Sequence, residues 1–278
     1  MADTLTPEKW GRKESADWWS AGQAARQQIY GAATEMMLDL AAVKAGSRVL
    51  DVAAGTGEST LMTARRVGPK GHVLAADVSA SMLNVAAEAA RQAGLANVET
   101  RVMNAENIEL DADSFDAVIC RMALMLFSTP GKALNRMRQV VKPGGKVAVM
   151  VHAALERNPY HSIRQETVRR LGKLPWPAPG EPWMFALGAP GVLEGLYREA
   201  GFQNVSVHAA AILRGFPSAA AAVGNMRKGA GDLKELMTEL KEADREIAWA
   251  EIEEKFKQFE GPNGLEIPGE VLIGVGTK

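Results

Sequence analysis

The chain has 278 residues, of which 47% are hydrophobic and 23% charged, as is usual for a globular protein with a large buried core. Its 32 basic and 33 acidic side chains nearly cancel, which removes any electrostatic case for nucleic-acid binding. No apolar run approaches the ~20 residues that span a bilayer, and residues 1–9 lack the features of a signal peptide. We expect a cytoplasmic enzyme with no stable membrane insertion.

The cysteine and histidine content argues against a metal centre. Cys120 is the only cysteine, which excludes an intrachain disulfide and a cluster of thiolate ligands. The four histidines are scattered along the chain, and no two of them are four residues apart. We therefore expect no bound metal.

Residues 1–46 predict a helical segment ahead of the first strand. Met36 and Leu40 fall at helical spacing before Lys44-Ala45-Gly46, a typical helix ending. This apolar spacing indicates a helix packed on the edge of a sheet. The segment also carries aromatic side chains, among them Trp18, Trp19 and Tyr30. Whether these pack in the same way or contact a ligand is left open by the pattern.

The next segment combines a buried strand with a glycine turn. Val49 to Val52 has the length and β-branched content of a buried strand, and it carries an acid, Asp51. Gly55-Thr56-Gly57 follows, and an amphipathic helix is predicted to begin near Ser59 or Thr60, with those hydroxyls as N-caps. A strand, a glycine turn and a helix N-terminus together allow a ligand to approach bare backbone.

Three features of this segment argue against a dinucleotide or a nucleoside triphosphate as the ligand. The dinucleotide fingerprint has a third glycine where this chain has Thr60, and Asp51 would repel a pyrophosphate. The Gly-Lys-Ser/Thr sequence of a P-loop does not follow the loop. The acid favours a ligand with a cationic group.

The rest of the chain predicts six further strands, at residues 72–77, 97–102, 115–120, 146–151, 202–212 and 271–276. Asp77 ends the second strand 20 residues after Gly57, the separation at which a Rossmann-like fold places a carboxylate on a ribose diol. The alternative is that Asp77 caps the helix expected over residues 81–93. Seven strands with intervening helices predict an α/β doubly wound sheet whose ligand lies at the carboxyl ends of the first strands.

Three motifs in this chain resemble those of a known family. They are Val-Leu-Asp-Val-Ala-Ala-Gly-Thr-Gly at 49–57, Phe-Asp-Ala-Val-Ile-Cys-Arg at 115–121 and Val-Lys-Pro-Gly-Gly-Lys-Val at 141–147. In this order and spacing, residues 47–151 resemble class I S-adenosylmethionine-dependent methyltransferases, and particularly the ubiquinone/menaquinone-biosynthesis C-methyltransferase-like group. The resemblance implies a Rossmann-like seven-stranded sheet, S-adenosylmethionine as the cofactor and S-adenosylhomocysteine as the product.

The resemblance also implies which residues hold the cofactor. Asp51 would orient the methionine ammonium, and Asp77 would hold the ribose hydroxyls. Arg121 is expected to be partly buried beside an acid, either Asp51 or a carboxylate of the substrate. The full set of expected cofactor-binding residues is Asp51, Ala53, Gly55, Gly57, Asp77, Val78, Met82, Asn104, Ala105 and Arg121. Many family members have Asp-Ala where this chain has Asn104-Ala105, and the amide keeps an acceptor for adenine.

Two insertions interrupt the methyltransferase-like pattern. Residues 152–190 are rich in aromatic side chains and prolines, which predicts an ordered lid over a ligand site. Within residues 191–278, which complete the sheet, a helical insertion is expected at about 218–259. Residues 1–46 would form an N-terminal helical cover, and residues 47–151 the cofactor-binding core. The expected substrate or lid residues are Trp18, Trp19, Tyr30, Met125, Tyr160 and Trp183.

The predicted function is methyl transfer from S-adenosylmethionine to a small-molecule acceptor, an O, C or N nucleophile that is apolar or aromatic. If the reaction needs a general base, His152 and His161 are the candidates, although each also fits simple packing in the lid. The alternatives are a cofactor-binding enzyme that does not transfer methyl, a catalytically silent scaffold and a nicotinamide dehydrogenase. A homodimer is compatible with the apolar stripes of residues 218–259.

Overall fold

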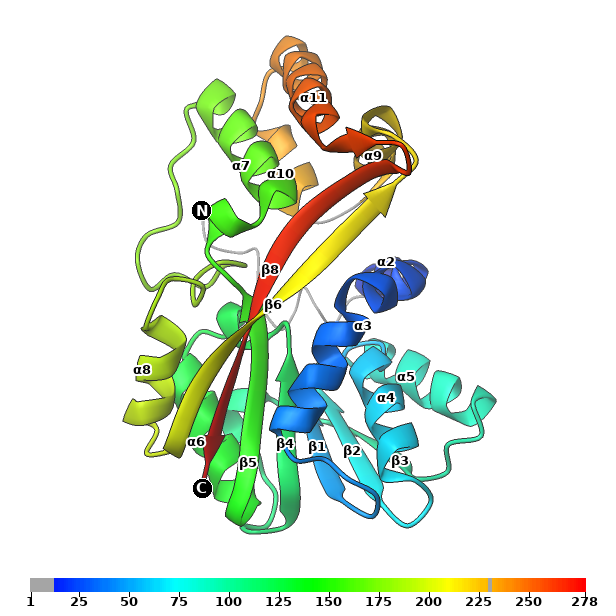
Figure 1. Cartoon of the computed structure of the whole chain (residues 1–278), viewed down its shortest axis with the longest axis vertical. Coiled ribbons are helices and arrows are strands. Elements are labelled where there is room, and N and C mark those ends of the chain that lie inside the picture. Colours follow the sequence, from blue (N-terminus) through cyan, green and yellow to red (C-terminus); the bar gives the residue numbers. More distant parts are fainter. Residues whose placement is uncertain (1–12, 230–231) are drawn as a thin grey trace.

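A computed structural model describes residues 13–229 and 232–278 (Figure 1). One sheet organises them, with the strand order β3-β2-β1-β4-β5-β8-β6. Its strands are β1 (Arg48–Val52), β2 (His72–Asp77), β3 (Val98–Val102), β4 (Phe115–Arg121), β5 (Val141–His152), β6 (Gln203–Phe216) and β8 (Gly264–Thr277), and the short β7 (Glu260–Gly261) pairs with β8. β1 to β5 pair in parallel, whereas β8 is antiparallel to β5 and β6. The predicted α/β doubly wound sheet is confirmed.

Helices cover both faces of the sheet because successive strand residues point to opposite sides. Val49 shares a core cluster with side chains of α3 (Gln23–Leu40) and α4 (Glu58–Val67). Its neighbour Leu50 belongs to the cluster on the other face, with side chains of α6 (Pro130–Val140) and α8 (Val192–Glu199). α5 (Ala80–Gln92) lies against β2 and β3. The strand order reverses between β1 and β4, and sheets of this kind bind ligands at the carboxyl ends of the strands beside that reversal.

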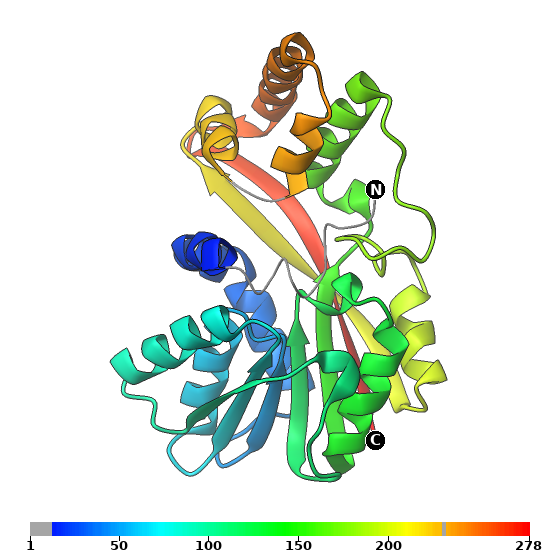
Figure 2. The same ribbon diagram turned by 180° about the vertical axis from the view of Figure 1, so that it is seen from behind.

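β6 and β8 continue past the sheet as a two-stranded ribbon (Figures 1 and 2). At its far end lie α9 (Ala219–Lys228), α10 (Asp232–Thr238) and α11 (Glu242–Phe256), together with α7 (Pro159–Gly172) from the segment after β5. Leu265 and Ile267 of the ribbon are fully buried among these helices. The two insertions therefore form one helical lobe, although they are far apart in the sequence.

The ribbon makes two strands longer than their patterns predicted. β6 extends beyond the expected end at residue 212, and β8 begins well before residue 271. Pro268, which pairs with Leu213 in the ribbon, explains why the sequence pattern did not predict this extension. Proline lacks the N–H that a strand residue normally donates and is therefore unusual inside a strand. Burial against the helical lobe replaces the contacts that a second sheet neighbour would have provided.

α2 (Lys13–Ala21) and α3 begin the described chain, with α2 beyond the carboxyl ends of the strands and α3 running from there along the sheet (Figure 1). The second half of α3 lies on the sheet, where Met37 and Leu38 are fully buried in the cluster that contains Val49 and Ile119. The first half extends past the strand ends toward the loop after β1. Within residues 13–229 and 232–278, no helix is long and apolar enough to cross a membrane.

Gly57, in the loop after β1, lies close against α5. It has a φ of +91°, and a Cβ atom there would lie 2.7 Å from the Cβ of Ala86. We expect Gly57→Ala to lower the free energy of unfolding by roughly 2–4 kcal/mol, because left-handed backbone strain and overpacking each cost about 1–2 kcal/mol or more. Urea unfolding measures this loss.

Gly46→Ala is the matched control for that substitution. Gly46 has a φ of +82°, but a Cβ atom there would meet nothing within 4 Å. Gly46→Ala should therefore lower the free energy of unfolding only by the cost of the left-handed backbone, about 1–2 kcal/mol. Equal losses in the two variants would show that the contact with Ala86 does not restrain the loop.

Candidate functional site

The loop between β1 and α4 lies at the carboxyl edge of the parallel strands. Ala53 and Gly55 have positive φ values of 55° and 56°. α4 begins at Glu58. Its N-cap residue is Gly57, so no side chain accepts a hydrogen bond at this end of the helix. The prediction that Ser59 or Thr60 caps this helix is therefore wrong. Both lie inside the first turn, where their hydroxyls are better placed to donate to a buried carboxylate.

That carboxylate belongs to Asp51, which is fully buried. Ser59 Oγ and Thr60 Oγ1 donate to its Oδ2 at 2.8 and 2.7 Å. Its Oδ1 is buried and has no hydrogen-bond partner in the described part of the chain. Burial raises the pKa of Asp51 to about 6, against the two hydroxyls, which lower it. At neutral pH the site thus presents a negative charge with one unpartnered oxygen, which fits an ammonium group.

The second acid of the site, Asp77, is tied to the same loop. Its Oδ2 accepts the backbone N–H of Gly55 at 2.8 Å, and its Oδ1 accepts the N–H of Ser79 at 2.9 Å. Ser79, rather than Asp77, caps α5, because its hydroxyl accepts the N–H of Met82. Burial raises the pKa of Asp77 as well. Each oxygen of an ionised carboxylate accepts more than one hydrogen bond, so Asp77 keeps capacity for ligand hydroxyls.

The residues expected around adenine follow the ends of two neighbouring strands. Asp77 pairs with Val102 in the β2–β3 register, so Val78 and Asn104 both lie just beyond this pair. Met82 and Ala105 are buried, with 4% and 8% of their surface exposed. Asn104 Oδ1 accepts the N–H of Glu106 at 2.8 Å and caps the short helix η1 (Ala105–Asn107). Apolar and polar groups thus meet beside Asp77, as a nucleoside site requires.

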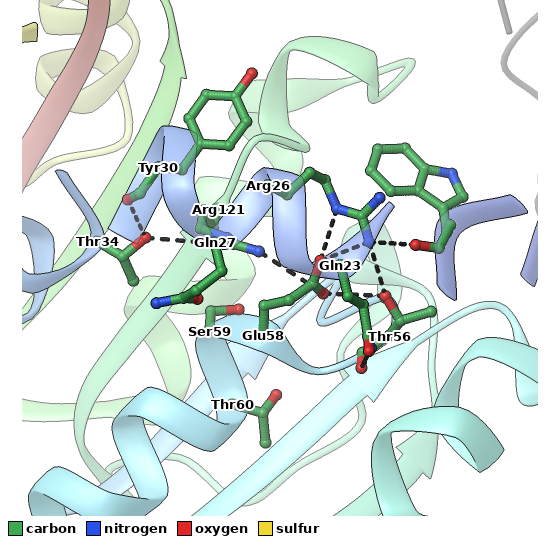
Figure 3. Close-up of polar contacts among 12 residues, drawn as sticks. Gln23, Arg26, Gln27, Tyr30, Thr34, Thr56, Glu58, Ser59, Thr60 and Arg121 are labelled. Carbon is green, nitrogen blue, oxygen red and sulfur yellow. Dashed lines mark hydrogen bonds and ion pairs between the residues drawn. The ribbon is translucent and has the colours of Figure 1, made fainter. Parts of the chain in front are cut away.

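The first half of α3 is joined to this edge by polar contacts (Figure 3). Arg26, Tyr30 and Thr34 are four residues apart and share one face of the helix. Arg26 Nε donates to Glu58 Oε1 at 2.6 Å. At the end of β4, Arg121 Nη1 donates to Thr34 Oγ1 at 3.4 Å. Gln23 Nε2 donates to the carbonyl of Thr56 in the loop at 2.8 Å, so α3 is held to both the loop and β4.

Glu58 is the acid that Arg121 contacts. Its carboxylate lies 2.5 Å from Arg26 and 3.8 Å from Arg121, and the side chains of Glu58 and Arg121 are each only 8% exposed. The prediction that Arg121 is partly buried beside an acid holds. The suggested partner Asp51 was wrong, because the ion pair that Arg121 makes among the described residues is with Glu58.

A second cluster gathers both candidate histidines. His152 is the last residue of β5 and His161 lies in α7, and their ring centroids are 5.0 Å apart. Tyr30 of α3 and Phe185 lie 6.2 and 5.1 Å from the His152 ring. Trp183 packs against Phe185 at 5.2 Å. Side chains from α3, the end of β5, α7 and the segment around Phe185 therefore meet at one place.

Two arginines flank the imidazole of His161. Arg164 Nη2 lies 2.6 Å from His161 Nδ1, and Arg214 Nη2 lies 3.3 Å from Nε2. Burial, followed by the charges of Arg214 and Arg164, lowers the pKa of His152 to about 3. Burial and the same arginines hold the pKa of His161 well below its usual value. Both histidines are therefore neutral at pH 7.

The other expected substrate residues have different surroundings. The Trp19 ring lies 4.3 Å from the guanidinium of Arg26. Tyr160 stacks on Phe216 and Phe256, each at 5.8 Å, in the core of the helical lobe. Met125 is buried in the core beneath the strand ends. The side chain of Trp18 lies outside the described residues.

Comparison with known proteins identifies the family. Residues 43–174 match the family described as a methyltransferase domain. The ubiquinone/menaquinone biosynthesis C-methyltransferase of Vibrio vulnificus is 32% identical over 184 residues, which is 62% of this chain and 70% of that protein. This chain belongs to the class I S-adenosylmethionine-dependent methyltransferases.

Solved structures share the fold of this methyltransferase. An S-adenosylmethionine-dependent methyltransferase from Aquifex aeolicus is 24% identical, covers 73% of this chain and 91% of its own, and has a TM-score of 0.54. A phosphoethanolamine N-methyltransferase from Haemonchus contortus is 18% identical, covers 99% of this chain and 60% of its own, and has a TM-score of 0.61. The likeness extends over the helical lobe as well as the sheet.

The site residues of the methyltransferase fit its cofactor, S-adenosylmethionine. The cofactor carries an ammonium, and Asp51 offers a buried carboxylate oxygen with no partner in the described part of the chain. The cofactor carries a ribose diol, and Asp77 lies beside the glycine loop. A Cβ atom on Gly55 would meet nothing within 4 Å, which leaves space against bare backbone.

Sequence reasoning missed four charged residues of this methyltransferase, namely Arg26, Glu58, Arg164 and Arg214. The spacing of Arg26 from Tyr30 and Thr34 is visible in the sequence and could have drawn attention to that helix face. The partner Glu58 lies 32 residues further along, however, and Arg214 lies 53 residues from His161. No local pattern predicts such contacts, because they depend on how α3 and β6 pack.

Proposed function

We propose that this methyltransferase transfers the methyl group of S-adenosylmethionine to a small, apolar or aromatic acceptor with an O, C or N nucleophile. The observation that carries the proposal is the buried Asp51 carboxylate, with its free oxygen, beside the glycine loop and Asp77. The aromatic cluster of Tyr30, His152 and Phe185 supports the kind of acceptor. The curated relative is named for a reaction of the same type, C-methylation in quinone biosynthesis.

In this proposal each acid binds a different part of the cofactor. Asp51 Oδ1 accepts a hydrogen bond from the ammonium, and Asp77 accepts from the ribose hydroxyls. Ala53, Gly55 and Gly57 bring bare backbone close to the ligand. Val78, Met82, Asn104 and Ala105 surround adenine. Arg121, paired with Glu58, supports the loop from the end of β4 rather than contacting Asp51.

The chemistry asks little of the protein beyond positioning. S-adenosylmethionine, when bound, supplies a methyl group on a positively charged sulfur that is already an activated leaving group. The chain must then orient the acceptor and exclude water. Tyr30, Phe185 and Trp183 are suited to that task because they come from the cover and the lid and pack together with His152.

The histidines fit acceptor binding better than proton transfer. A general base works best when its pKa is near the working pH, and the pKa of His152 is about 3. Its Nδ1 is buried with no hydrogen-bond partner among the described residues. We assign it the role of orienting the acceptor, with residues 1–46 as cover and residues 152–190 as lid.

A product assay tests the proposed function. The protein is incubated with S-adenosylmethionine and a panel of quinols, phenols and small amines, and mass spectrometry quantifies S-adenosylhomocysteine and methylated acceptor together. Equal formation of both products is expected with at least one acceptor. An acceptor converted without S-adenosylhomocysteine would favour an enzyme that uses the cofactor without methyl transfer. Calorimetric binding of NADH, with none of S-adenosylmethionine, would contradict the cofactor itself.

A further inference from the structure

Two guanidinium groups in the histidine cluster have no carboxylate partner among the described residues. Arg164 donates through Nε to the carbonyl of Tyr160, and its Nη2 lies 2.6 Å from His161 Nδ1. Arg214 donates through Nη2 to Tyr30 Oη, and the same Nη2 lies 3.3 Å from His161 Nε2. The neutral imidazole of His161 can accept from only one of the two arginines, and all of these partners are uncharged. Across residues 13–229 and 232–278, no ion pair involves either arginine, whereas Arg26 and Arg121 at the cofactor loop share Glu58.

Burial makes these two charges unusual. Arg164 is only 6% exposed, and Arg214 is half-buried on the ribbon. Both guanidiniums lie on the ring of Tyr160, at 4.2 and 4.9 Å from its centroid. Contact with an aromatic ring offsets only part of the cost of removing a charge from water. Two like charges around one neutral imidazole therefore leave a local excess of positive charge that an anion would neutralise.

The cluster also lies where an acceptor must lie. His152 ends β5 at the carboxyl edge of the sheet, the same edge that carries Asp51 on β1 and Arg121 on β4. α3 links the two places, because Arg26 contacts the loop and Tyr30, one turn later, contacts Arg214. The buried Nδ1 of His152, which has no partner among the described residues, adds a polar atom beside the rings of Tyr30 and Phe185.

We propose that the methyl acceptor is a small aromatic molecule with an anionic oxygen group, a carboxylate or a phosphate, which Arg214 and Arg164 bind beside Tyr30 and His152. This inference rests on the proposed function and names its substrate class. Guanidinium groups match both head groups through paired N–H donors. Nη1 of both arginines is engaged by no other residue of the described chain, so donors remain for such a group.

Ligand binding to the full chain tests the inference. Benzoate, phenyl phosphate and neutral benzamide are titrated by calorimetry into protein saturated with S-adenosylhomocysteine. We expect benzoate or phenyl phosphate to bind and benzamide not to bind. The preferred anion then distinguishes a carboxylate head group from a phosphate. Arg214→Gln and Arg164→Gln should each weaken that binding at least about tenfold, because each removes a charge-assisted hydrogen bond.

The controls separate loss of the site from loss of the fold. Arg198→Gln removes an exposed arginine that is paired with Glu194, and should leave anion binding unchanged. S-adenosylhomocysteine affinity should stay within about twofold in every variant, since none contacts the cofactor loop. If a glutamine variant fails to fold, Arg214→Lys keeps the charge without the planar fork and should retain part of the binding.

Two results would overturn the inference while the proposed function stands. One is that neither anion binds to protein that does bind S-adenosylhomocysteine. The other is that an anion binds equally well to wild type and to both glutamine variants. Failure of S-adenosylhomocysteine itself to bind would instead overturn the proposed function, and this inference with it.

Discussion

An asparagine in place of Asp51 is expected to weaken the binding of S-adenosylhomocysteine by about tenfold to a hundredfold. A hydrogen bond to a charged group contributes roughly 1.5–3 kcal/mol, and about 1.4 kcal/mol corresponds to tenfold. The amide has the same size, and its oxygen can still accept from Ser59 and Thr60, so the loop should keep its conformation. Calorimetry at pH 7.5 measures the change.

5′-Methylthioadenosine is the matched ligand for this variant, because it has the adenosine but not the amino-acid end. Its affinity should stay within about twofold in Asp51→Asn. An equal loss for both ligands would mean that the substitution distorts the loop. Unchanged binding of S-adenosylhomocysteine would remove Asp51 from the ammonium site.

The raised pKa of Asp51 adds a pH dependence to the same comparison. Only the ionised carboxylate attracts an ammonium, and the pKa of the free protein's Asp51 is about 6. Wild-type affinity for S-adenosylhomocysteine should therefore fall about tenfold between pH 7 and pH 5, whereas that of Asp51→Asn should stay flat. A flat wild-type profile would show that the charge of Asp51 does not contribute.

Stability should change with pH in the opposite direction. The folded pKa of about 6 lies above the ordinary value of 3.8, so the folded chain binds the proton more tightly than the unfolded chain. The ionised Asp51 thus destabilises the fold above pH 6, by on the order of 3 kcal/mol, and this penalty disappears as pH falls from 6 toward 4. Asp51→Asn should be more stable than wild type at pH 7.5 and similar to it near pH 4.5 in urea unfolding.

Asp77→Asn is expected to weaken both S-adenosylhomocysteine and 5′-methylthioadenosine by about tenfold or more, because both ligands carry the ribose diol. The amide can accept only through its oxygen, whereas Asp77 now accepts the N–H groups of Gly55 and Ser79 through separate oxygens. One of these N–H groups would face an NH₂ donor. The free energy of unfolding should therefore also fall, by about 1–3 kcal/mol.

Asp116→Asn is the control for replacing a carboxylate that accepts a backbone N–H. Asp116 likewise accepts a backbone N–H, that of Arg48, but it lies at the opposite end of β1 and is paired with Lys142. Its substitution should leave both ligand affinities within about twofold. If Asp77→Asn weakened only S-adenosylhomocysteine, Asp77 would belong to the amino-acid end of the ligand rather than to the ribose.

The glycine loop and the two acids beside it could be predicted because they are local. Asp51 and Gly57 belong to one strand–loop–helix unit, and Asp77 ends the next strand along the chain. Parallel neighbours in a sheet end at the same edge, so alternation and turn residues are enough to bring them together. The errors in this region concern fine detail, such as which residue caps α4 and which acid contacts Arg121.

The cluster around His152 and His161 could not be predicted in this way. Tyr30 and Arg214 are 184 residues apart in the chain, and their contact depends on a ribbon that carries β6 past the sheet toward α3. His152 and His161 were each visible as candidates. Nothing in their spacing showed that they face each other or that two arginines lie around them.

The sequence by itself determined the sheet, its glycine loop and the two acids beside it, because each arises from short-range periodicity and turn chemistry. Only the tertiary structure decided which charges are paired. Glu58 pairs with Arg26 and Arg121 beside the glycine loop, whereas in the described part of the chain Arg164 and Arg214 meet around His161 without an acid. Such pairing depends on the packing of segments far apart in the chain, and local propensity carries no information about it.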